Sequence, residues 1–255
     1  MNLNKEIKYN SSSQVLTNTG KNQNQNIDLS IFSDTSSKDI KNSLLKKTFS
    51  ITYTLLLTTA VITFIEAIRT PNAKIRHILN LETCISFVAS YFYLEFLENI
   101  NNKNIDWSNI TQTRYIDWSI TTPMMLLTLC LVLSMNSNTI IHLKIISLII
   151  ILNYVMLLFG YLGEIKKIER IYATIFGFIP FLLMFFIIFI NYVKPKYSKA
   201  NYVLFGFYFF VWSLYGVVYL FDEEYKNMIT NILDLIAKCL LGLGLWLYYT
   251  NVIYW

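Results

Sequence analysis

The feature that most constrains the fold of this chain is a series of apolar blocks, each about twenty residues long. About twenty apolar residues in a helix span the hydrocarbon core of a bilayer. Seven such blocks can be marked, near residues 48–68, 78–98, 115–133, 144–162, 171–192, 200–221 and 228–250. Because backbone polar groups in lipid must be hydrogen-bonded within their own segment, each block is expected to be a helix. The sequence therefore predicts an integral, multi-pass membrane protein, an all-α bundle of seven transmembrane helices.

Basic residues in the short links predict the orientation of the bundle. The links after the first, third and fifth blocks carry basic residues without acidic ones, namely Arg69, Lys74, Arg76, Lys144, Lys194, Lys196 and Lys199. Under the positive-inside rule these links are cytoplasmic and the amino terminus is outside. The fourth link departs from this pattern, because Lys166, Lys167 and Arg170 lie there beside Glu164 and Glu169. Residues 1–45 are polar and Asn-rich and are expected to form a disordered extracellular tail, which leaves 46–255 as the membrane domain.

Composition excludes several classes of function. The net charge of +5 is spread over links and tail without a basic face interleaved with aromatic residues, so anionic lipid is expected as a partner and nucleic acid is not. Cys84, Cys130 and Cys239 lie inside predicted helices without metal-type spacing, so no metal is expected. The sequence contains no phosphate-binding glycine loop and no hydrolase or kinase motif, which argues against an enzyme.

A lysine lies inside the last apolar block. Lys238 is surrounded by apolar residues, and Asp234 precedes it by one helical turn on the same face. An ammonium group in hydrocarbon is costly, so an intramembrane lysine is a functional-site hypothesis by default. A purely structural ion pair is the alternative.

A second polar cluster, in the third block, favours a functional site. Asp117, Thr121 and Thr128 repeat at intervals of four and seven residues and share one helix face, with Arg114 one turn toward the outside. If Lys238 formed a protonated Schiff base with an aldehyde, its charge would need a nearby anion. Asp117 and Asp234, on two different helices, could supply it. If the positive charge of the Schiff base were moved or removed, its proton would pass most simply to Asp117.

Four segments of the sequence resemble the microbial, or type 1, rhodopsins. They are RYIDWSITTP at 114–123, MLLFGYLGE at 156–164, WSLY at 212–215 and DLIAK at 234–238. The resemblance covers roughly residues 46–250 and implies the seven-helix bundle of the bacteriorhodopsin type. The acidic residue followed by two threonines, together with Glu82, looks most like the viral rhodopsins of giant algal viruses.

The resemblance implies a role for each matching position. Lys238 would bind all-trans retinal, Asp117 would be the primary proton acceptor and counterion, and Asp234 would be the second counterion. Arg114 would be their positive partner, and Thr121 would hydrogen-bond Asp117. Tyr91 and Tyr215 would hold Asp234. The retinal pocket would also include Trp118, Thr122, Met125, Met156, Gly160, Trp212 and Tyr219.

One departure bears on the mode of transport. Thr128 stands where outward proton pumps of the family usually place an acidic proton donor. Glu82, in the second block, is the expected substitute, and a structural glutamate held by polar neighbours is the alternative.

The resemblance implies a light-activated ion transporter, with outward proton pumping ahead of a light-gated cation channel. Cys239 after the lysine, and the lack of Glu in 84–89, argue against a channel. Asn231, Glu66 and Glu82 favour one, because together they could line a wet path. A sensory photoreceptor and a scaffold without chromophore are the remaining alternatives. Trimers and pentamers are both common among relatives, so a homo-oligomer of either kind is compatible with the resemblance. The expected location is a host or cellular membrane.

Overall fold

The computed structural model describes residues 43–101 and 105–250, and these residues form helices joined by short links. The helices are Ser43–Arg69, α2 (Ala73–Asn101), α3 (Trp107–Ser137), α4 (Leu143–Glu164), α5 (Arg170–Ile188) with the π-helix η1 (Phe189–Val193), α6 (Lys199–Val218), and α7 (Glu223–Asp234) with the π-helix η2 (Leu235–Leu240) and α8 (Leu241–Tyr249). Each predicted block corresponds to one helix or one continuous helical segment. The predicted tail, 1–45, lies outside the described residues except for its last three, which begin the first helix.

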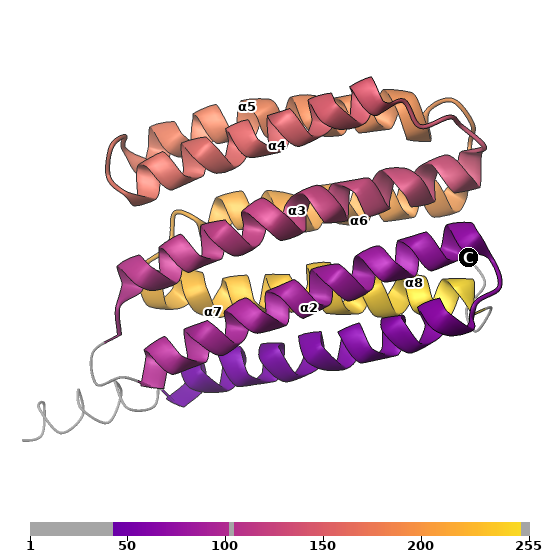
Figure 1. Ribbon diagram of the computed structural model, residues 1–255. Helices are drawn as coiled ribbons and strands as arrows, with labels where there is room; N and C mark the ends of the chain where they lie inside the picture. Colours follow the sequence, from indigo (N-terminus) through magenta and orange to yellow (C-terminus); the bar gives the residue numbers. More distant parts are fainter. Residues whose placement is uncertain (1–42, 102–104, 251–255) are drawn as a thin grey trace, which may run out of the picture. The chain divides into compact units, whose positions relative to one another are not determined.

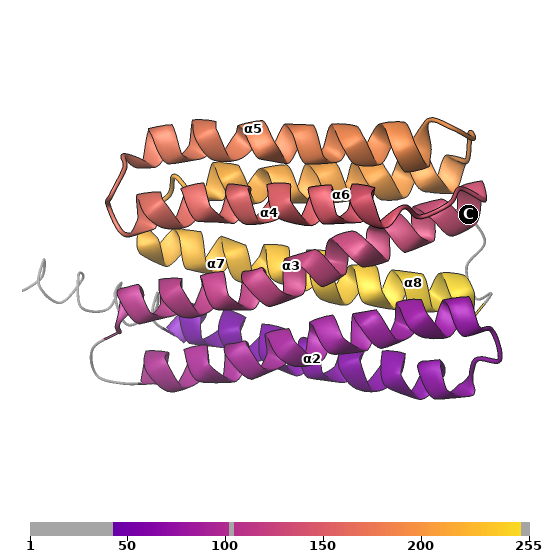
Figure 2. The same cartoon turned by 45° about the horizontal axis from the view of Figure 1, so that its top comes forward.

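The described residues from Lys46 onward form one compact unit, in which neighbouring helices run side by side. Consecutive helices alternate in direction, and α4 packs on α5 as α2 packs on α3. Figures 1 and 2 both show the last helical segment, α7–η2–α8, between α2 and α6, and it contacts both of them. The polar residues that the sequence analysis placed on the last segment therefore lie in the interior of the bundle.

Burial in this bundle differs from that in a water-soluble protein, because large apolar side chains also cover its outer surface. Large apolar side chains point outward, with Ile171 63% and Phe186 58% exposed. Asp117 and Asp234 are completely buried, and Lys238 is 2% exposed. An apolar outer surface of this extent is stable only in contact with lipid. The structure therefore confirms the all-α, multi-pass membrane bundle.

The second helix is less apolar than the others. In the described part of the chain, six helical segments are long and apolar enough to cross a membrane, and α2 is not one of them. It carries Glu82, Glu95 and Glu98 within its 29 residues. Glu82 faces the interior of the bundle, where it is 1% exposed. The low hydropathy of α2 therefore reflects in part a polar face directed at the protein interior.

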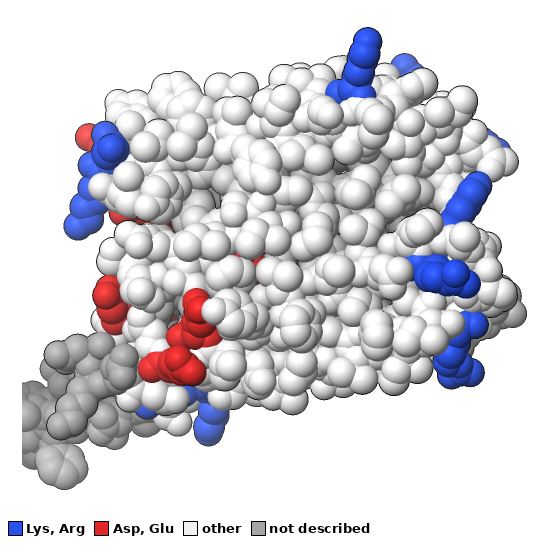
Figure 3. All heavy atoms as spheres, viewed as in Figure 1, with Lys and Arg blue, Asp and Glu red and all other residues white. Residues whose placement is uncertain are grey.

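Charge differs between the two ends of the bundle. Figure 3 shows Lys and Arg without acidic side chains at the end that carries the α3–α4 and α5–α6 links, and both signs at the opposite end. At the end of mixed charge, Asp106 precedes α3. Its side chain accepts a hydrogen bond from the Asn109 amide at 3.0 Å and caps the helix. The orientation with the amino terminus outside stays a prediction, and the charge distribution is its basis.

Candidate functional site

The centre of the candidate site is an ion pair between the third and the last helical segments. The Lys238 Nζ lies 2.7 Å from Asp117 Oδ2 and 3.9 Å from Asp234 Oδ2. All three side chains are at most 2% exposed. Two carboxylates and one ammonium in a water-poor interior interact far more strongly than at a surface. The structure therefore brings together the three residues that the sequence analysis joined.

The local backbone at Lys238 is unusual. The segment Leu235–Leu240 is a π-helix, inserted between the α-helices α7 and α8. π-helical turns are rare and occur often at functional sites, because the wider turn shifts the direction of the side chains that follow it. Here the wider turn begins directly after Asp234 and contains Lys238.

The two carboxylates have different surroundings. Asp234 accepts hydrogen bonds from Tyr93 at 2.8 Å and from Tyr215 at 2.7 Å, and its Oδ2 lies 3.6 Å from Arg114 Nη1. Asp117 Oδ2 accepts a bond from Lys238, whereas its Oδ1 has no hydrogen-bond partner among the described residues. Donors that point at a carboxylate stabilise its anion. Two hydrogen-bond donors thus point at the Asp234 carboxylate, whereas one oxygen of Asp117 has none among the described residues.

Arg114 is held beside Asp234 by asparagines of the last helical segment. Its Nη2 donates to Asn231 Oδ1 at 2.7 Å, and its Nε donates to Asn227 Oδ1 at 3.1 Å. The guanidinium also lies 4.9 Å from the ring centre of Phe96, a cation–π distance. A guanidinium with donors in a fixed fork suits this multiple contact. Arg114 thus lies beside Asp234, and its role as the positive partner of both carboxylates stays a prediction.

One predicted contact is wrong, and a second is made by a backbone atom. Tyr91 is 56% exposed on the outer face of α2, and Tyr93, on the buried face, holds Asp234 in its place. Thr121 does bond to Asp117, but to the backbone carbonyl at 2.9 Å rather than to the carboxylate. This bond satisfies the buried hydroxyl within its own helix, one turn back. It leaves the Asp117 carboxylate to Lys238.

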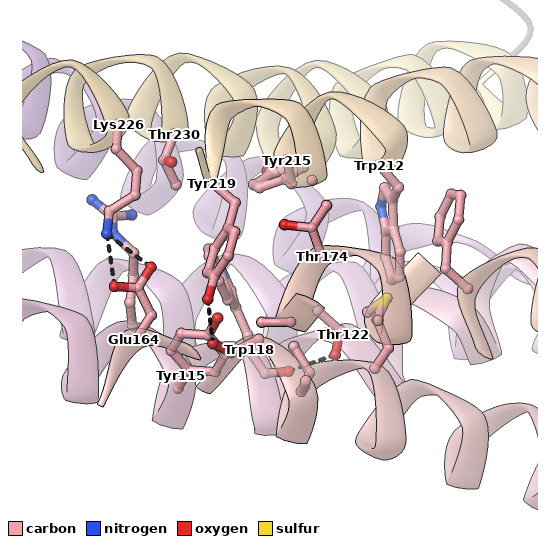
Figure 4. A pocket seen from close by; sticks show the side chains of 18 of the residues that line it. Tyr115, Trp118, Thr122, Glu164, Thr174, Trp212, Tyr215, Tyr219, Lys226 and Thr230 are labelled. Carbon is pink, nitrogen blue, oxygen red and sulfur yellow. Dashed lines mark hydrogen bonds and ion pairs between the residues drawn. The ribbon is translucent and has the colours of Figure 1, made fainter. Parts of the chain in front are cut away.

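A cavity leads away from Lys238 between the helices α3 to α7. Of the predicted pocket residues, all except Tyr91 line it, namely Trp118, Thr122, Met125, Met156, Gly160, Trp212, Tyr215, Tyr219 and Lys238. Figure 4 shows Trp212 at one end of the cavity and Glu164 with Lys226 at the other, with Tyr219 between them. Tyr219 donates a hydrogen bond to the Gly160 carbonyl at 2.9 Å, and Asn153 donates one to Thr122 at 2.8 Å. The sequence analysis did not assign Asn153 to the site.

The chemistry of this cavity fits retinal. Its central lining is aromatic and apolar, as a polyene requires, and an amine and a carboxylate meet beside it. Two glycines keep the walls close. A Cβ at Gly160 would lie 2.5 Å from the Tyr115 hydroxyl, and one at Gly216 would lie 2.5 Å from the Phe178 ring. These glycines allow the Tyr115 hydroxyl and the edge of the Phe178 ring to approach the backbone closely.

Glu82 lies on the other side of Lys238 from Asp234. A Cβ at Gly242, one turn beyond Lys238, would lie 2.9 Å from Glu82 Oε2, so this glycine makes room for the carboxyl group. Glu82 Oε1 and Thr128 Oγ1 are buried without a hydrogen-bond partner among the described residues. This finding disagrees with the alternative of a structural glutamate held by polar neighbours, because one of its oxygens has no such neighbour.

A buried lysine paired with two carboxylates beside an apolar cavity, inside a seven-helix membrane bundle, defines a retinal-binding photoprotein. The family model for bacteriorhodopsin-like proteins matches residues 44–252, so the chain belongs to this family, the microbial type 1 rhodopsins, whose members bind retinal through a Schiff base to a lysine.

Relatives of known structure agree with this family. The crystal structure of viral rhodopsin OLPVRII is 39% identical, has a TM-score of 0.78, and is matched over 83% of this chain and 100% of that chain. The predicted likeness to viral rhodopsins is thereby confirmed. The green-light absorbing proteorhodopsin of Gamma-proteobacterium EBAC31A08 is 25% identical over 206 residues, 75% of this chain and 80% of the relative. The proton pumping rhodopsin AR2 from the marine alga Acetabularia acetabulum shares the fold at 21% identity and a TM-score of 0.69, over 82% of this chain and 96% of that chain.

Proposed function

We propose that this protein is a light-driven ion transporter that moves protons outward, with retinal linked to Lys238. The observation that carries the proposal is the 2.7 Å contact between Lys238 Nζ and Asp117 Oδ2, both fully enclosed. Retinal, when bound, supplies the absorption of light and the change of shape that follows. The protein supplies the nitrogen that holds the proton, the carboxylate that accepts it, and the exclusion of water around both.

The carboxylates of Asp117 and Asp234 have different roles in the proposed transfer. Asp234 accepts from two tyrosines and lies beside Arg114, so its charge is stabilised before and after light absorption. The Asp117 carboxylate has Lys238 as its single hydrogen-bond partner among the described residues, and its second oxygen has none. When the Lys238 nitrogen turns from its resting position, the proton passes to the carboxylate that is closest and least stabilised as an anion. That carboxylate is Asp117.

The proton that Lys238 loses must be replaced from the other side for net transport. Glu82 lies toward the α8 side of Lys238, whereas Asp234 lies toward the α7 side. A carboxyl group buried without hydrogen-bond donors is more stable when it carries its proton, and such a group can give the proton up to a base. Glu82 is therefore the proposed donor, and with the predicted orientation the proton moves outward.

A light-gated cation channel is the second candidate. Ser86 Oγ, Glu82 Oε1 and Thr128 Oγ1 are all buried without a hydrogen-bond partner among the described residues. Buried polar atoms of this kind are usually satisfied by water. A chain of water along α2 and α3 could carry cations instead of a single proton. We favour the pump, because a proton acceptor, Asp117, and a proposed proton donor, Glu82, on opposite sides of Lys238 suit proton transfer in one direction.

Photocurrent recordings separate the candidates. We expect the protein, expressed with retinal in a voltage-clamped cell, to give outward current under light when the ion gradients and the voltage are both zero. A channel would give current that changes sign at the equilibrium potential of the permeant cation. Coloured protein without any current would contradict both transport modes and favour the sensory photoreceptor.

Replacement of Glu82 by glutamine is expected to slow recovery of the dark state at least about tenfold, because an amide cannot give a proton to Lys238. Flash photolysis of the purified pigment measures this recovery. Glu98→Gln is the matched control, since Glu98 is exposed on the same helix. Recovery of Glu82→Gln at the parent rate would exclude Glu82 as the donor.

A further inference from the structure

Four charged side chains meet at the end of the bundle that carries the α4–α5 link, and we refer to them as the four-residue ion cluster. They are Glu164 at the end of α4, Arg170 at the start of α5, and Glu223 and Lys226 in the first turn of α7. Lys226 Nζ donates to both oxygens of Glu164, at 2.8 and 2.9 Å, and to Glu223 at 3.0 Å. Arg170 bridges the two acids, at 3.3 Å from Glu164 and in close contact with Glu223.

Burial within the four-residue ion cluster is graded. The side chains of Glu164 and Lys226 are 4% and 10% exposed, whereas those of Glu223 and Arg170 are 32% and 35% exposed. The outer two meet water, and the inner two are shielded from it. A buried ion pair is weak evidence for stability, because the cost of removing its charges from water offsets their attraction. The inner pair therefore calls for an explanation other than stability alone.

Glu164 and Lys226, the inner pair of the cluster, form one wall of the cavity that also contains Lys238. Glu164 and Lys226 line its outer end, and Thr230, Asn227 and Asp234 line it further in, along the same helical segment. Figure 4 shows the dashed contacts between Lys226 and Glu164 at the end of the cavity far from Trp212. A row of polar side chains thus leads from the carboxylates near Lys238 to the inner pair. Directly beyond that pair lie the partly exposed Arg170 and Glu223.

Arg114 connects the inner pair to the centre of the site. Its Nε binds Asn227, the residue that follows Lys226, while its Nη1 lies 3.6 Å from Asp234. A change of charge at Asp117 or Lys238 alters the field on this guanidinium, and its hydrogen bond to Asn227 reaches the start of α7. A continuous set of contacts thus joins the inner pair to the groups that change charge.

We propose that the Glu164–Lys226 ion pair is a gate that closes the retinal cavity at the α4–α5 end, and that water and the transported ion leave the cavity when this pair separates. The inference rests on the retinal linkage at Lys238 proposed above. It differs from a purely structural tie between α4 and α7, which would affect stability without affecting access to Lys238.

Access of hydroxylamine to Lys238 tests the gate. This small neutral molecule converts bound retinal to its oxime, frees the Lys238 amine and bleaches the colour, so its rate in the dark reports how often the cavity opens. We expect Glu164→Gln and Lys226→Met each to bleach at least about tenfold faster than the parent, because each leaves half of a buried pair unsatisfied. Lys226→Arg, which keeps the charge, is expected to stay nearer the parent rate.

Matched controls come from the same link. Glu169→Gln and Lys167→Met change exposed charges between α4 and α5 and are expected to bleach at the parent rate. A second measurement locates the opening. Thr230→Cys places a thiol in the cavity wall, one turn from Lys226, and its labelling by a charged thiosulfonate reagent is expected to accelerate when Lys226→Met is added.

Three results would overturn the gate: parent bleaching rates in both pair variants, equal acceleration in the two controls, or Thr230→Cys labelling that Lys226→Met leaves unchanged. Because the pair is broken from either side, failure of one variant to fold leaves the other to decide. A parent protein that forms no colour would instead contradict the retinal linkage, so the two failures are distinguishable.

Discussion

Replacement of Lys238 by alanine is expected to abolish formation of pigment completely. Two lysines line the cavity, Lys226 and Lys238, and their surroundings decide which one reacts with an aldehyde. Lys226 Nζ is occupied by three carboxylate oxygens of Glu164 and Glu223. Lys238 Nζ has Asp117 as its one hydrogen-bond acceptor among the described residues, and it lies beside the aromatic lining. Absorption spectra after addition of all-trans retinal measure the result.

Replacement of Lys238 also changes the stability of the folded protein. Lys238→Ala leaves Asp117 and Asp234 as buried carboxylates without the ammonium, and breaking a buried pair in this way costs about 3–5 kcal/mol. Lys238→Arg separates the two effects, because it keeps the positive charge but has no amine for the aldehyde. We expect both variants to stay colourless, with Lys238→Arg closer to the parent in thermal unfolding. Colour in a folded Lys238→Arg protein, or its loss in Lys226→Met rather than in Lys238→Ala, would contradict the linkage at Lys238.

The error at Tyr91 shows what helix periodicity could have added to the sequence analysis. The buried face of α2 includes Glu82, Ser86, Ala89 and Tyr93. At about 100° per residue, Tyr93 lies within about 20° of Glu82 around the helix axis, whereas Tyr91 lies on the opposite side. Since Glu82 had already been placed inside the bundle, the same helix register would have selected Tyr93. Tyr91 was instead assigned from the family resemblance alone.

Local spacing predicted the centre of the site better than its periphery. Asp234 and Lys238 are four residues apart on one segment, and Asp117 comes from a repeat on another, so each could be assigned from sequence. The four-residue ion cluster joins residues 62 apart in the chain, Glu164 and Lys226, whose contact depends on how two link regions meet. The π-helix at Lys238 likewise has no signal in the apolar sequence around it. These features follow from tertiary packing rather than from any one segment.

Replacement of Asp117 by asparagine is expected to shift absorption to longer wavelength and to abolish proton loss from the Lys238 nitrogen. At an effective dielectric constant of about 20, a unit charge at the 2.7 Å of Asp117 interacts with that nitrogen by about 6 kcal/mol, and one at the 3.9 Å of Asp234 by about 4 kcal/mol. Arg114 offsets much of the Asp234 charge, so Asp117 dominates.

The direction of the shift follows from where charge moves. Light absorption moves positive charge away from the Lys238 nitrogen along the polyene, and a nearby anion opposes this movement. Without the Asp117 charge the excitation requires less energy, which corresponds to a shift of roughly tens of nanometres. Flash photolysis should then show no deprotonated form, because the closest acceptor is an amide. Asp234→Asn is the matched control, with a smaller shift and proton transfer retained. If proton transfer instead survives in Asp117→Asn and disappears in Asp234→Asn, Asp234 is the acceptor, and the hydrogen bonds from Tyr93 and Tyr215 do not hold it as a permanent anion.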